Sequence, residues 1–260
     1  MRGAIVVAMI GCGGGGHAAA PDAAAIAHCR PAPFTGITPT VVLTPAEEVA
    51  LPTRASFTIT GMSGWLFERD ASFANPQMID LGPYLIATPS VTPEGDELFY
   101  TPSIEPMMLH TAHRIAPDQW IDMHDAPPGA MAGRPSAGPM RRVFVDANGV
   151  GLGWQEYKQT ASGWTAVGAP VDATALFGAD HGGSQLGLSD DGLLLLFTAS
   201  APGDFTLRYA VRTSLDEPFQ TSTLLLDGVH RDASLSEDCT TLTTIEGQNV
   251  GEAIERFVQP

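Results

Sequence analysis

A short motif that recurs along the chain constrains the fold more than any other feature. Residues 90–100 read SVTPEGDELFY, residues 187–197 read GLSDDGLLLLF, and residues 234–242 read SLSEDCTTL. Each copy joins a polar turn with an acidic residue to an alternating or apolar run. A motif repeated every 40 to 50 residues or so is typical of repeat architectures. We therefore expect the chain to repeat one structural unit.

Each copy predicts a β-hairpin. The expected turn residues are Gly95, Asp96, Asp191, Gly192 and Asp238. An acidic residue next to glycine favours a tight turn, because glycine adopts a positive φ without steric cost. The run that follows has the length and residue types of a buried strand. The acids recur in every copy, which indicates a structural role, because a single catalytic site would need its carboxylates only once.

Two further copies are predicted. Residues 144–154 read FVDANGVGLGW, with Asn148 and Gly149 as the turn, and residues 56–67 contain two glycines in their turn region. A second landmark is an aromatic residue, often followed closely by proline, that we expect to open each unit. These aromatic residues are Phe34, Phe73, Trp120, Trp164 and Phe219.

The spacing of these features predicts a β-propeller. After the hairpin, residues 109–114, 207–212 and 254–258 predict a further strand that carries a basic residue. Four short strands per unit at this period are typical of a propeller blade, and the 260 residues accommodate five blades. The alternative is an ordinary β-sandwich with chance Asp-Gly turns. We expect an all-β fold, a five-bladed propeller over residues 34–260.

The repeated motif resembles the WD40-like, or PD40, repeat of TolB-type β-propellers, whose consensus runs Ser-Pro-Asp-Gly-x-x-Leu-x-Phe-x-Ser. Residues 189–200, SDDGLLLLFTAS, carry the resemblance, and residues 212–219 are similar to the blade-to-blade link of propeller lipoproteins from predatory soil bacteria. The pattern departs at Pro93, which sits one place late, and at Cys239, which replaces the turn glycine. The resemblance implies a fold and says little about function, because such repeats serve many unrelated proteins.

Composition excludes several partners. The net charge is −16, from 13 basic and 29 acidic residues, which argues against binding of nucleic acid or of an anionic membrane surface. Hydrophobic residues make up 44% and charged residues 16%, as in folded globular proteins. We expect contact with a membrane only through a lipid anchor.

The first residues predict that anchor. Residues 1–11 combine a basic start, an apolar run and small residues before Cys12, which is typical of a bacterial lipoprotein signal peptide. Cys12 would then carry the lipid, and the Gly- and Ala-rich residues 12–33 would form a flexible tether. An ordinary secretion signal is the alternative. The predicted location is the cell envelope, outside the cytoplasmic membrane.

Two cysteines remain, and we expect them to form a disulfide. Cys29 precedes the first predicted blade and Cys239 lies in the last predicted hairpin, so a bond between them would join the ends of the ring. Paired cysteines outside the cytoplasm usually form such bonds, and closing so long a loop contributes about 3 to 5 kcal/mol. Two unrelated buried thiols are the alternative.

One stretch contains residues that could bind a metal. His110, His113, Asp122 and His124 lie within fifteen residues, and imidazole and carboxylate suit zinc, manganese or iron. On a strand, His110 and His113 would face opposite sides, so the alternative is surface decoration of a strand and a turn. The motif of a serine nucleophile, Gly-x-Ser-x-Gly, is absent.

The sequence therefore predicts a non-catalytic envelope lipoprotein that binds a protein, a peptide or a glycan and needs no cofactor. Recognition is the usual role of a rigid ring with many variable loops. The alternative is a metal-dependent envelope polysaccharide hydrolase or lyase with its site in the propeller channel, using the His110 set.

Overall fold

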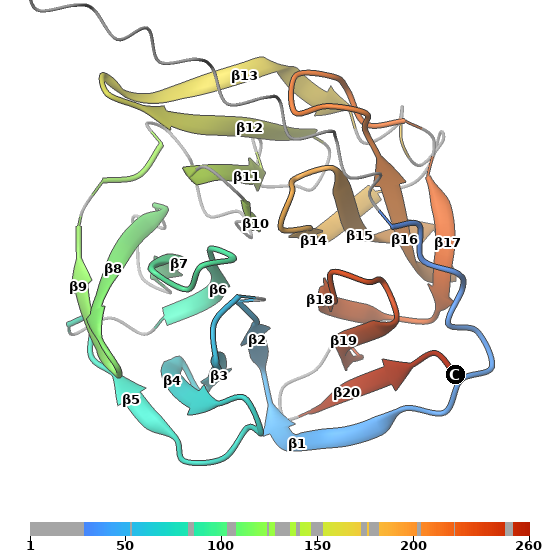
Figure 1. The fold of residues 1–260 in the computed structure, drawn as a ribbon, viewed down its shortest axis with the longest axis horizontal. Helices are drawn as coiled ribbons and strands as arrows, with labels where there is room; N and C mark the ends of the chain where they lie inside the picture. The colour runs from blue at the N-terminus through green and yellow to red at the C-terminus, as the bar shows by residue number, and fades with distance from the viewer. Residues whose placement is uncertain are drawn as a thin grey trace, which may run out of the picture.

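The computed structural model shows a ring of β-sheets (Figure 1). It describes residues 29–52, 54–82, 86–102, 108–123, 125–127, 136–138, 141–146, 153–172, 176, 182–201, 204–220, 222–247 and 252–260. In these residues, twenty strands form five four-stranded antiparallel sheets, which make the five-bladed β-propeller that the sequence predicts. Within the same residues, no helix has the length and apolar character needed to cross a membrane.

The first four blades each use four consecutive strands, from the centre of the ring outward (Figure 1). Blade 1 comprises β2 (Glu48–Ala50), β3 (Phe57–Met62), β4 (Trp65–Asp70) and β5 (Gln77–Ile79). Blade 2 comprises β6 (Ile86–Val91), β7 (Glu97–Pro102), β8 (His110–Ala116) and β9 (Gln119–Asp122). Blade 3 comprises β10 (Ser136–Gly138), β11 (Arg142–Asp146), β12 (Gly153–Thr160) and β13 (Gly163–Asp172). Blade 4 comprises β14 (Gly182–Leu188), β15 (Leu194–Ala201), β16 (Asp204–Val211) and β17 (Thr223–Asp227).

Blade 5 combines the two ends of the described chain. Its inner strands are β18 (His230–Leu235), β19 (Thr241–Glu246) and β20 (Glu252–Val258), and its outermost strand is β1 (Thr40–Ala46). β1 pairs with β20 in antiparallel register, with Thr40 opposite Arg256. The ring is therefore closed by backbone hydrogen bonds between the first and the last strand.

Blade 4 shows why apolar runs form the second strand of a blade. Leu194 and Leu196 pack with side chains of blade 5, whereas Leu195 and Phe197 pack with side chains of blade 3. All four are at most 2% exposed. Because successive side chains of a strand point to opposite faces, a strand between two neighbouring blades must be apolar on both faces.

The aromatic landmark recurs once in each blade, but its predicted position at the opening of the unit was wrong. Phe34, Phe73 and Phe219 precede β1, β5 and β17, while Trp120 and Trp164 lie in β9 and β13. These are the fourth strands of the five blades. The landmark therefore marks where a blade ends, and its physical basis is the packing between blades.

At three interfaces, the aromatic residue in or just before the fourth strand contacts an aromatic residue on the second strand of the preceding blade. These pairs are Trp120 with Phe57 (ring centroids 6.3 Å apart), Trp164 with Phe99 (5.8 Å) and Phe219 with Phe144 (5.8 Å). Two of the three have the edge-to-face geometry that aromatic rings prefer. Each pair fills the wedge that opens between two blades away from the channel.

Two of the predicted motif copies do not occupy the same place as the other three. The copies at residues 92–96, 189–193 and 236–240 connect the first and second strands of blades 2, 4 and 5. Ser63 and Gly64 connect the second and third strands of blade 1, and the predicted turn at residues 148–149 falls between β11 and β12, again a second and a third strand. Sequence similarity between hairpins alone does not distinguish these two connections.

The structure also corrects the alignment of Pro93. Thr92 makes the same backbone contact in blade 2 as Ser189 in blade 4, because the carbonyl oxygen of each accepts a hydrogen bond from the turn glycine. The Gly95 amide donates to Thr92 O at 2.9 Å, and the Gly192 amide donates to Ser189 O at 2.8 Å. Thr92 therefore occupies the serine position of the motif. Pro93 follows it directly and is in register with the consensus.

Candidate functional site

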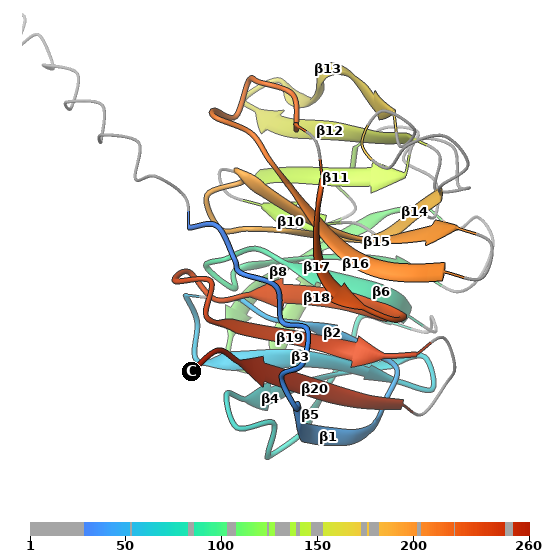
Figure 2. The same cartoon turned by 90° about the vertical axis from the view of Figure 1, so that its right-hand side faces the viewer.

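The five connections between first and second strands lie on one face of the ring. They surround the end of the central channel in Figure 1, and in the side view of Figure 2 the strands of each blade run between this face and the opposite one. We call this region the mouth and define it by residues 51–56 (53 excepted), 92–96, 141, 189–193 and 236–240. Loops that a rigid ring brings together are a common place for recognition.

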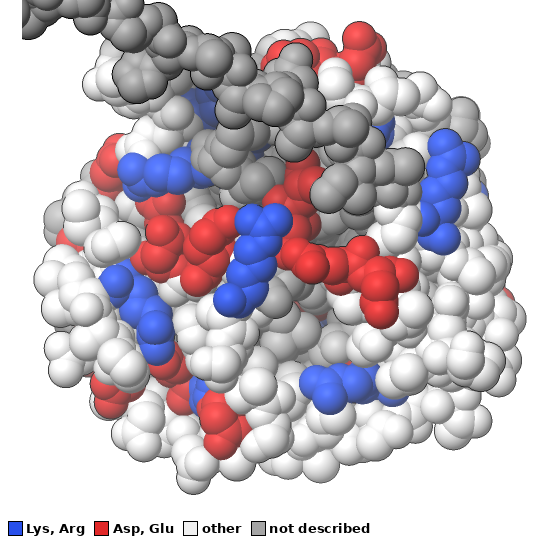
Figure 3. Space-filling model, in the orientation of Figure 1, with Lys and Arg blue, Asp and Glu red and all other residues white. Residues whose placement is uncertain are grey.

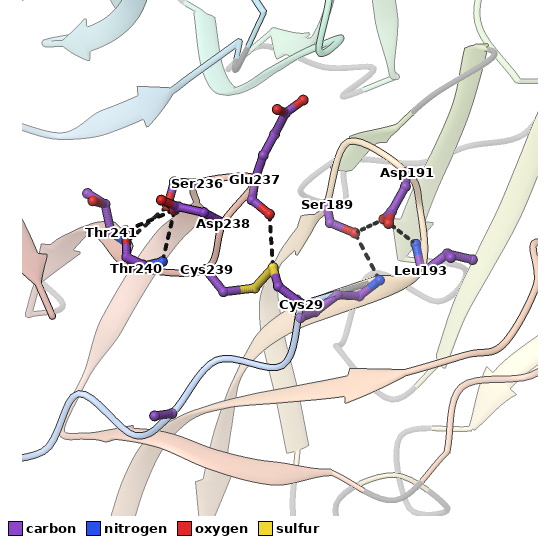
Figure 4. The surroundings of a disulfide bond; sticks show 12 residues. Cys29, Ser189, Asp191, Leu193, Ser236, Glu237, Asp238, Cys239, Thr240 and Thr241 are labelled. Atoms are coloured by element: carbon purple, nitrogen blue, oxygen red, sulfur yellow. Dashed lines mark hydrogen bonds between the residues drawn. A yellow bond between two sulfur atoms is a disulfide. The ribbon is translucent and has the colours of Figure 1, made fainter. Parts of the chain in front are cut away.

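Side-chain hydrogen bonds fix the turns of blades 4 and 5 in the same way. Ser189 Oγ donates to Asp191 Oδ1 at 2.7 Å, and the Leu194 amide donates to Ser189 Oγ at 2.9 Å. In blade 5, Ser236 Oγ donates to Asp238 Oδ1 at 2.6 Å. Figure 4 shows both arrangements side by side. Because serine and aspartate satisfy backbone donors of the turn, these residues have a structural role here.

Blade 2 reaches the same result with a different carboxylate. Thr92 Oγ1 donates to Asp96 Oδ1 at 2.6 Å, and the Glu97 amide donates to Thr92 Oγ1 at 3.2 Å. The residue at the Asp191 position is Glu94, whose carboxylate is instead directed to Arg54. Asp96 therefore stabilises this turn, and the Glu94 side chain lies on the surface of the mouth.

Glycine recurs in these turns because the backbone at its position is left-handed. Gly95 and Gly192 have φ of 76° and 69°, and Cys239 adopts the same conformation with φ of 59°. At Gly95 a side chain would also collide with the ring of Phe57, 2.7 Å from the nearest ring atom. A residue other than glycine in this conformation costs about 1 kcal/mol. Cys239 bears this cost in the turn of blade 5, so another interaction must favour a cysteine there.

That reason is the disulfide between Cys29 and Cys239. The two Cα atoms lie 5.8 Å apart although 210 positions separate them in the sequence. Cys239 is 3% exposed, and Figure 4 places the bond beside the turn of blade 5. The bond ties the segment before β1 to the hairpin between β18 and β19, as the sequence predicts. Disulfides of this kind are typical of proteins outside the cytoplasm.

Arg54 lies among three carboxylates from three other blades. Its Nη1 is 2.8 Å from Glu94 Oε1, and its Nε is 3.5 Å from Glu237 Oε1 and 3.6 Å from Asp190 Oδ2. The Arg54 amide also donates to Pro93 O at 2.9 Å. Figure 3 shows acidic side chains on either side of a basic one over the middle of this face. Blades 1, 2, 4 and 5 are thereby linked across the mouth.

The electrostatic environment keeps Arg54 charged. Burial lowers the pKa of its guanidinium, but the charges of Asp190 and Glu94 and the hydrogen bond to Glu94 outweigh that effect, so the pKa lies above its ordinary value. The side chain is nevertheless 47% exposed, and so are most of its partners. Water screens such exposed pairs, and they add little stability. Their main effect is on the charge pattern of the surface.

A second arginine stands in the corresponding connection of blade 3. Arg141 donates from Nε to Glu97 Oε2 at 2.8 Å and from Nη2 to Glu97 Oε1. The hydrogen bond to Glu97 raises the pKa of Arg141, and burial opposes that rise. Blades 1 and 3, which lack the repeated motif at this connection, thus supply arginines, while blades 2, 4 and 5 supply carboxylates. Arg54 and Arg141 were not identified as site residues from the sequence. The one signal in the sequence is that each is a basic residue in a connection that lacks the repeated motif.

The channel beneath the mouth is narrow. Its cavity measures about 60 Å³ and is lined by the first strands of all five blades, including Val49, Ser90, Ala137, Leu186 and Ala233. This volume corresponds to about two water molecules. A side chain added at Gly187 would clash with the backbone of the neighbouring strand. A peptide or a glycan can therefore contact the mouth but cannot enter the channel in this conformation.

The predicted metal ligands are only partly brought together. His110 Nδ1 lies 3.5 Å from Asp122 Oδ2 on neighbouring strands of blade 2. His113, three positions along β8, is exposed on the other face of the sheet. His124 lies outside the described residues. Among the residues that the structure describes, no group of three or more His, Cys, Asp or Glu side chains is placed to hold a metal ion.

Three other predicted site residues, Cys12, Asn148 and Gly149, also lie outside the described part of the chain. The lipidation of Cys12 and the predicted role of residues 148–149 therefore stay predictions.

Comparison with solved structures identifies other β-propellers. A TolB from Acinetobacter baumannii aligns with a TM-score of 0.55 at 13% identity, over 85% of this chain and 57% of that protein. A functionally unknown protein from Desulfotomaculum acetoxidans DSM 771 aligns with a TM-score of 0.50 at 11% identity, over 78% of this chain and 62% of that one. The chain thus spans less than two thirds of either protein.

Comparison of sequences adds nothing to this result. No protein-family model matches the chain, and no curated protein matches its sequence. At 11 and 13% identity, structural similarity establishes the fold alone. The chain is a five-bladed β-propeller that is structurally similar to the propeller of TolB.

Proposed function

We propose that the protein is a non-catalytic binding protein of the cell envelope, attached outside the cytoplasmic membrane by lipid on Cys12, and that it binds a protein, a peptide or a glycan at the mouth. The observation that carries the proposal is the convergence of charged side chains from different blades around Arg54 on one face. Such a surface can be recognised by a partner of complementary charge.

The rigidity of the mouth supports binding. Its turns are held by their own serine, threonine and aspartate side chains, as at Ser189 and Asp191. The carboxylates directed to Arg54 remain accessible, since the side chains of Glu94 and Glu237 are 48% and 67% exposed. A surface that is ordered before binding loses little conformational entropy when a partner binds.

The disulfide supports the proposed location. Cys29 and Cys239 are oxidised in the folded chain, and structural disulfides persist mainly in oxidising compartments. The lipid on Cys12 is the part of the proposal that the sequence alone motivates, through the signal-like residues 1–11.

An in-cell cross-linking pull-down tests the proposal, with the full-length protein as bait. We expect one envelope partner to be recovered and to be lost with the variant Glu94→Gln/Asp190→Asn/Glu237→Gln, which removes the three carboxylates around Arg54. The matched control is Asp80→Asn/Glu217→Gln/Asp227→Asn, which removes three exposed charges outside the mouth and should retain the partner.

A fourth bait, Cys12→Ala, separates location from recognition. Loss of the partner with Cys12→Ala together with its recovery on mixing purified components supports an anchored recognition protein. Equal recovery with the mouth variant and with the wild-type chain would place the binding surface elsewhere and contradict the proposal, as would the absence of any specific partner.

A further inference from the structure

The third strands of blades 1 and 3 carry a glutamate at the same ladder position. Glu68 is opposite Ile59 and Glu156 is opposite Phe144, in each case the third pair of the ladder between second and third strand. Both glutamates face the following blade and bind an arginine there. Arg114 Nε donates to Glu68 Oε2 at 3.0 Å, and Arg212 Nη1 donates to Glu156 Oε2 at 2.7 Å.

Blade 5 has the opposite charge at this position. Arg256 is opposite Thr243, again the third pair of the ladder, and it faces blade 1. Its guanidinium carbon lies 5.7 Å from the centre of the Phe73 ring. Among the described residues, no carboxylate pairs with Arg256 and none of its side-chain nitrogens makes a hydrogen bond. The interface between blades 5 and 1 therefore contains an arginine whose donors are available.

A groove lies at the same interface. Its volume is about 690 Å³, and its lining includes Arg256, Thr241, Thr243 and Ser234 from blade 5 and Leu51 from blade 1. In blades 2 and 3, the residue at the position of Thr243 is Phe99 or Phe144, and each of these rings packs on an aromatic residue of the next blade. In blade 5 a threonine stands in place of this phenylalanine, and its side chain, 4% exposed, forms part of the wall of the groove. The Thr243 hydroxyl makes no hydrogen bond within the described residues.

We propose that this groove binds a small ligand through a carboxylate group, with the Arg256 guanidinium as the principal donor and the Thr243 hydroxyl beside it. The planar guanidinium matches a carboxylate in two parallel hydrogen bonds, and Phe73 holds it by a cation–π contact. The groove adjoins the mouth and shares Leu51, Pro52 and residues 236–238 with it, but Arg54 is not part of its lining and Arg256 lies outside the mouth.

Two acidic residues at the rim restrict the ligand further. Asp238 and Glu237 also line the groove, but Asp238 Oδ1 accepts bonds from Ser236 and Thr240, and Glu237 lies 3.5 Å from Arg54. Their charges repel a dianion such as phosphate or sulfate more strongly than a singly charged carboxylate. The groove is therefore expected to select a ligand with one carboxylate at its inner end.

Calorimetric titration of the full chain with trialanine tests this inference, because that peptide carries one free terminal carboxylate. We expect saturable binding of trialanine and none of its C-terminal amide. Arg256→Gln should weaken binding at least about tenfold, since a charge-assisted hydrogen-bonded pair is lost. The matched control Arg208→Gln removes an arginine from the third strand of blade 4, where it contacts Ser222 outside the groove, and should bind as the wild type does.

A second variant keeps the proposal testable if Arg256→Gln does not fold. Thr243→Phe keeps the charge and fills the groove with the ring found in blades 2 and 3, so it should abolish binding in a folded protein. Equal binding of the amide, binding that survives both variants, displacement of trialanine by an equal concentration of sulfate, or no saturable binding would each overturn the proposal.

Discussion

The interface between blades 3 and 4 and the interface between blades 5 and 1 use the same strand positions in opposite ways. Between blades 3 and 4, Glu156 is buried, accepts hydrogen bonds from Arg142 and Arg212, and lies beside the packed rings of Phe144 and Phe219. Between blades 5 and 1, Arg256 occupies the position of Glu156, and Thr243 occupies the position of Phe144. We call the first the paired interface and the second the open interface.

The difference teaches that the packing between blades can change while the blades themselves do not. Blades 3 and 5 have the same strand order and the same ladder between their second and third strands. In the paired interface, the buried carboxylate of Glu156 binds the buried guanidinium groups of Arg142 and Arg212, so removal of one partner leaves a buried charge unpaired. At the open interface, the chain itself connects the two blades, because β1 pairs with β20 in blade 5 and leads directly into β2 of blade 1.

The largest expected effect comes from breaking the paired interface. Glu156→Gln leaves Arg142 and Arg212 buried without their carboxylate, and both side chains are less than 10% exposed. Breaking a buried ion pair on one side costs about 3 to 5 kcal/mol of stability. Urea-induced unfolding measures the loss, and the control Glu217→Gln changes an exposed residue of the same interface loop. A loss equal to that of the control would show that the ion pairs do not distinguish the interfaces.

The next effect concerns the disulfide, which ties the segment before β1 to the β18–β19 hairpin of blade 5. Cys29→Ala removes the disulfide and should lower the free energy of unfolding by about 2 to 4 kcal/mol, because a long loop of the unfolded chain is released. Within that background, Cys239→Gly should be more stable than Cys239→Ala by about 1 kcal/mol, because only glycine adopts the left-handed conformation without cost. If the order of the two variants is reversed, the conformation of Cys239 is not what limits that hairpin.

Filling the open interface should have a smaller effect of opposite sign. Thr243→Phe places a ring opposite Phe73, as Phe99 and Phe144 are placed opposite an aromatic residue of the next blade, and should raise the free energy of unfolding by about 0.5 to 1.5 kcal/mol. The melting temperature measures the change, with Thr244→Ser on the other face of the same strand as a control for substitution in β19. A drop for Thr243→Phe would mean that the groove is too narrow for a ring, and the two interfaces would then differ in shape as well as in sequence.

The smallest effect is a dependence on pH that is confined to blade 5. Burial lowers the pKa of His230, whose ring packs on Phe257, and the carbonyl of Asp227 and the charge of Glu246 oppose that effect. The unfolded chain therefore takes up the proton first. Stability should be complete above about pH 6.5 and should fall as the pH drops through that value toward the lower pKa of the folded state.

His230→Gln should remove the part of the pH dependence that begins below about pH 6.5, while the response due to carboxyl groups stays. That remaining response includes Glu68 of blade 1. Burial raises the pKa of Glu68, but hydrogen bonds from Arg114 and Trp120 lower it by more, so its contribution to stability is lost as the pH falls from the ordinary carboxyl pKa toward the lower pKa of the folded state. Unfolding curves at several pH values measure both steps. An unchanged slope in His230→Gln would assign it to another group.

The sequence allowed the hairpins of blades 2, 4 and 5 to be predicted, because each depends on residues within a span of six positions. Ser189, Asp191 and Gly192 bond and bend the backbone of their own turn, so the signal is local. The predicted copy around Ser63 and Gly64 joins the second and third strands of its blade instead, for the complementary reason. A turn signal marks a hairpin and does not say which pair of strands the hairpin joins.

The charged side chains of the candidate site were beyond prediction. Arg54 meets Glu94, Asp190 and Glu237, which are 40, 136 and 183 positions away in the sequence. No periodicity relates an arginine to a particular set of distant acids. The same holds for Arg256, whose lack of a carboxylate partner becomes meaningful only beside the pairs that Glu68 and Glu156 make.

By itself, the sequence determined the repeating unit, the number of blades and the two cysteines that join distant parts of the chain. These follow from local turn chemistry, from strand periodicity and from the small number of cysteines, none of which depends on how the blades face one another. The tertiary structure decided which charges are paired, which remain available and where a groove stays open. Those outcomes depend on closure of the ring, which places side chains from opposite ends of the chain in contact.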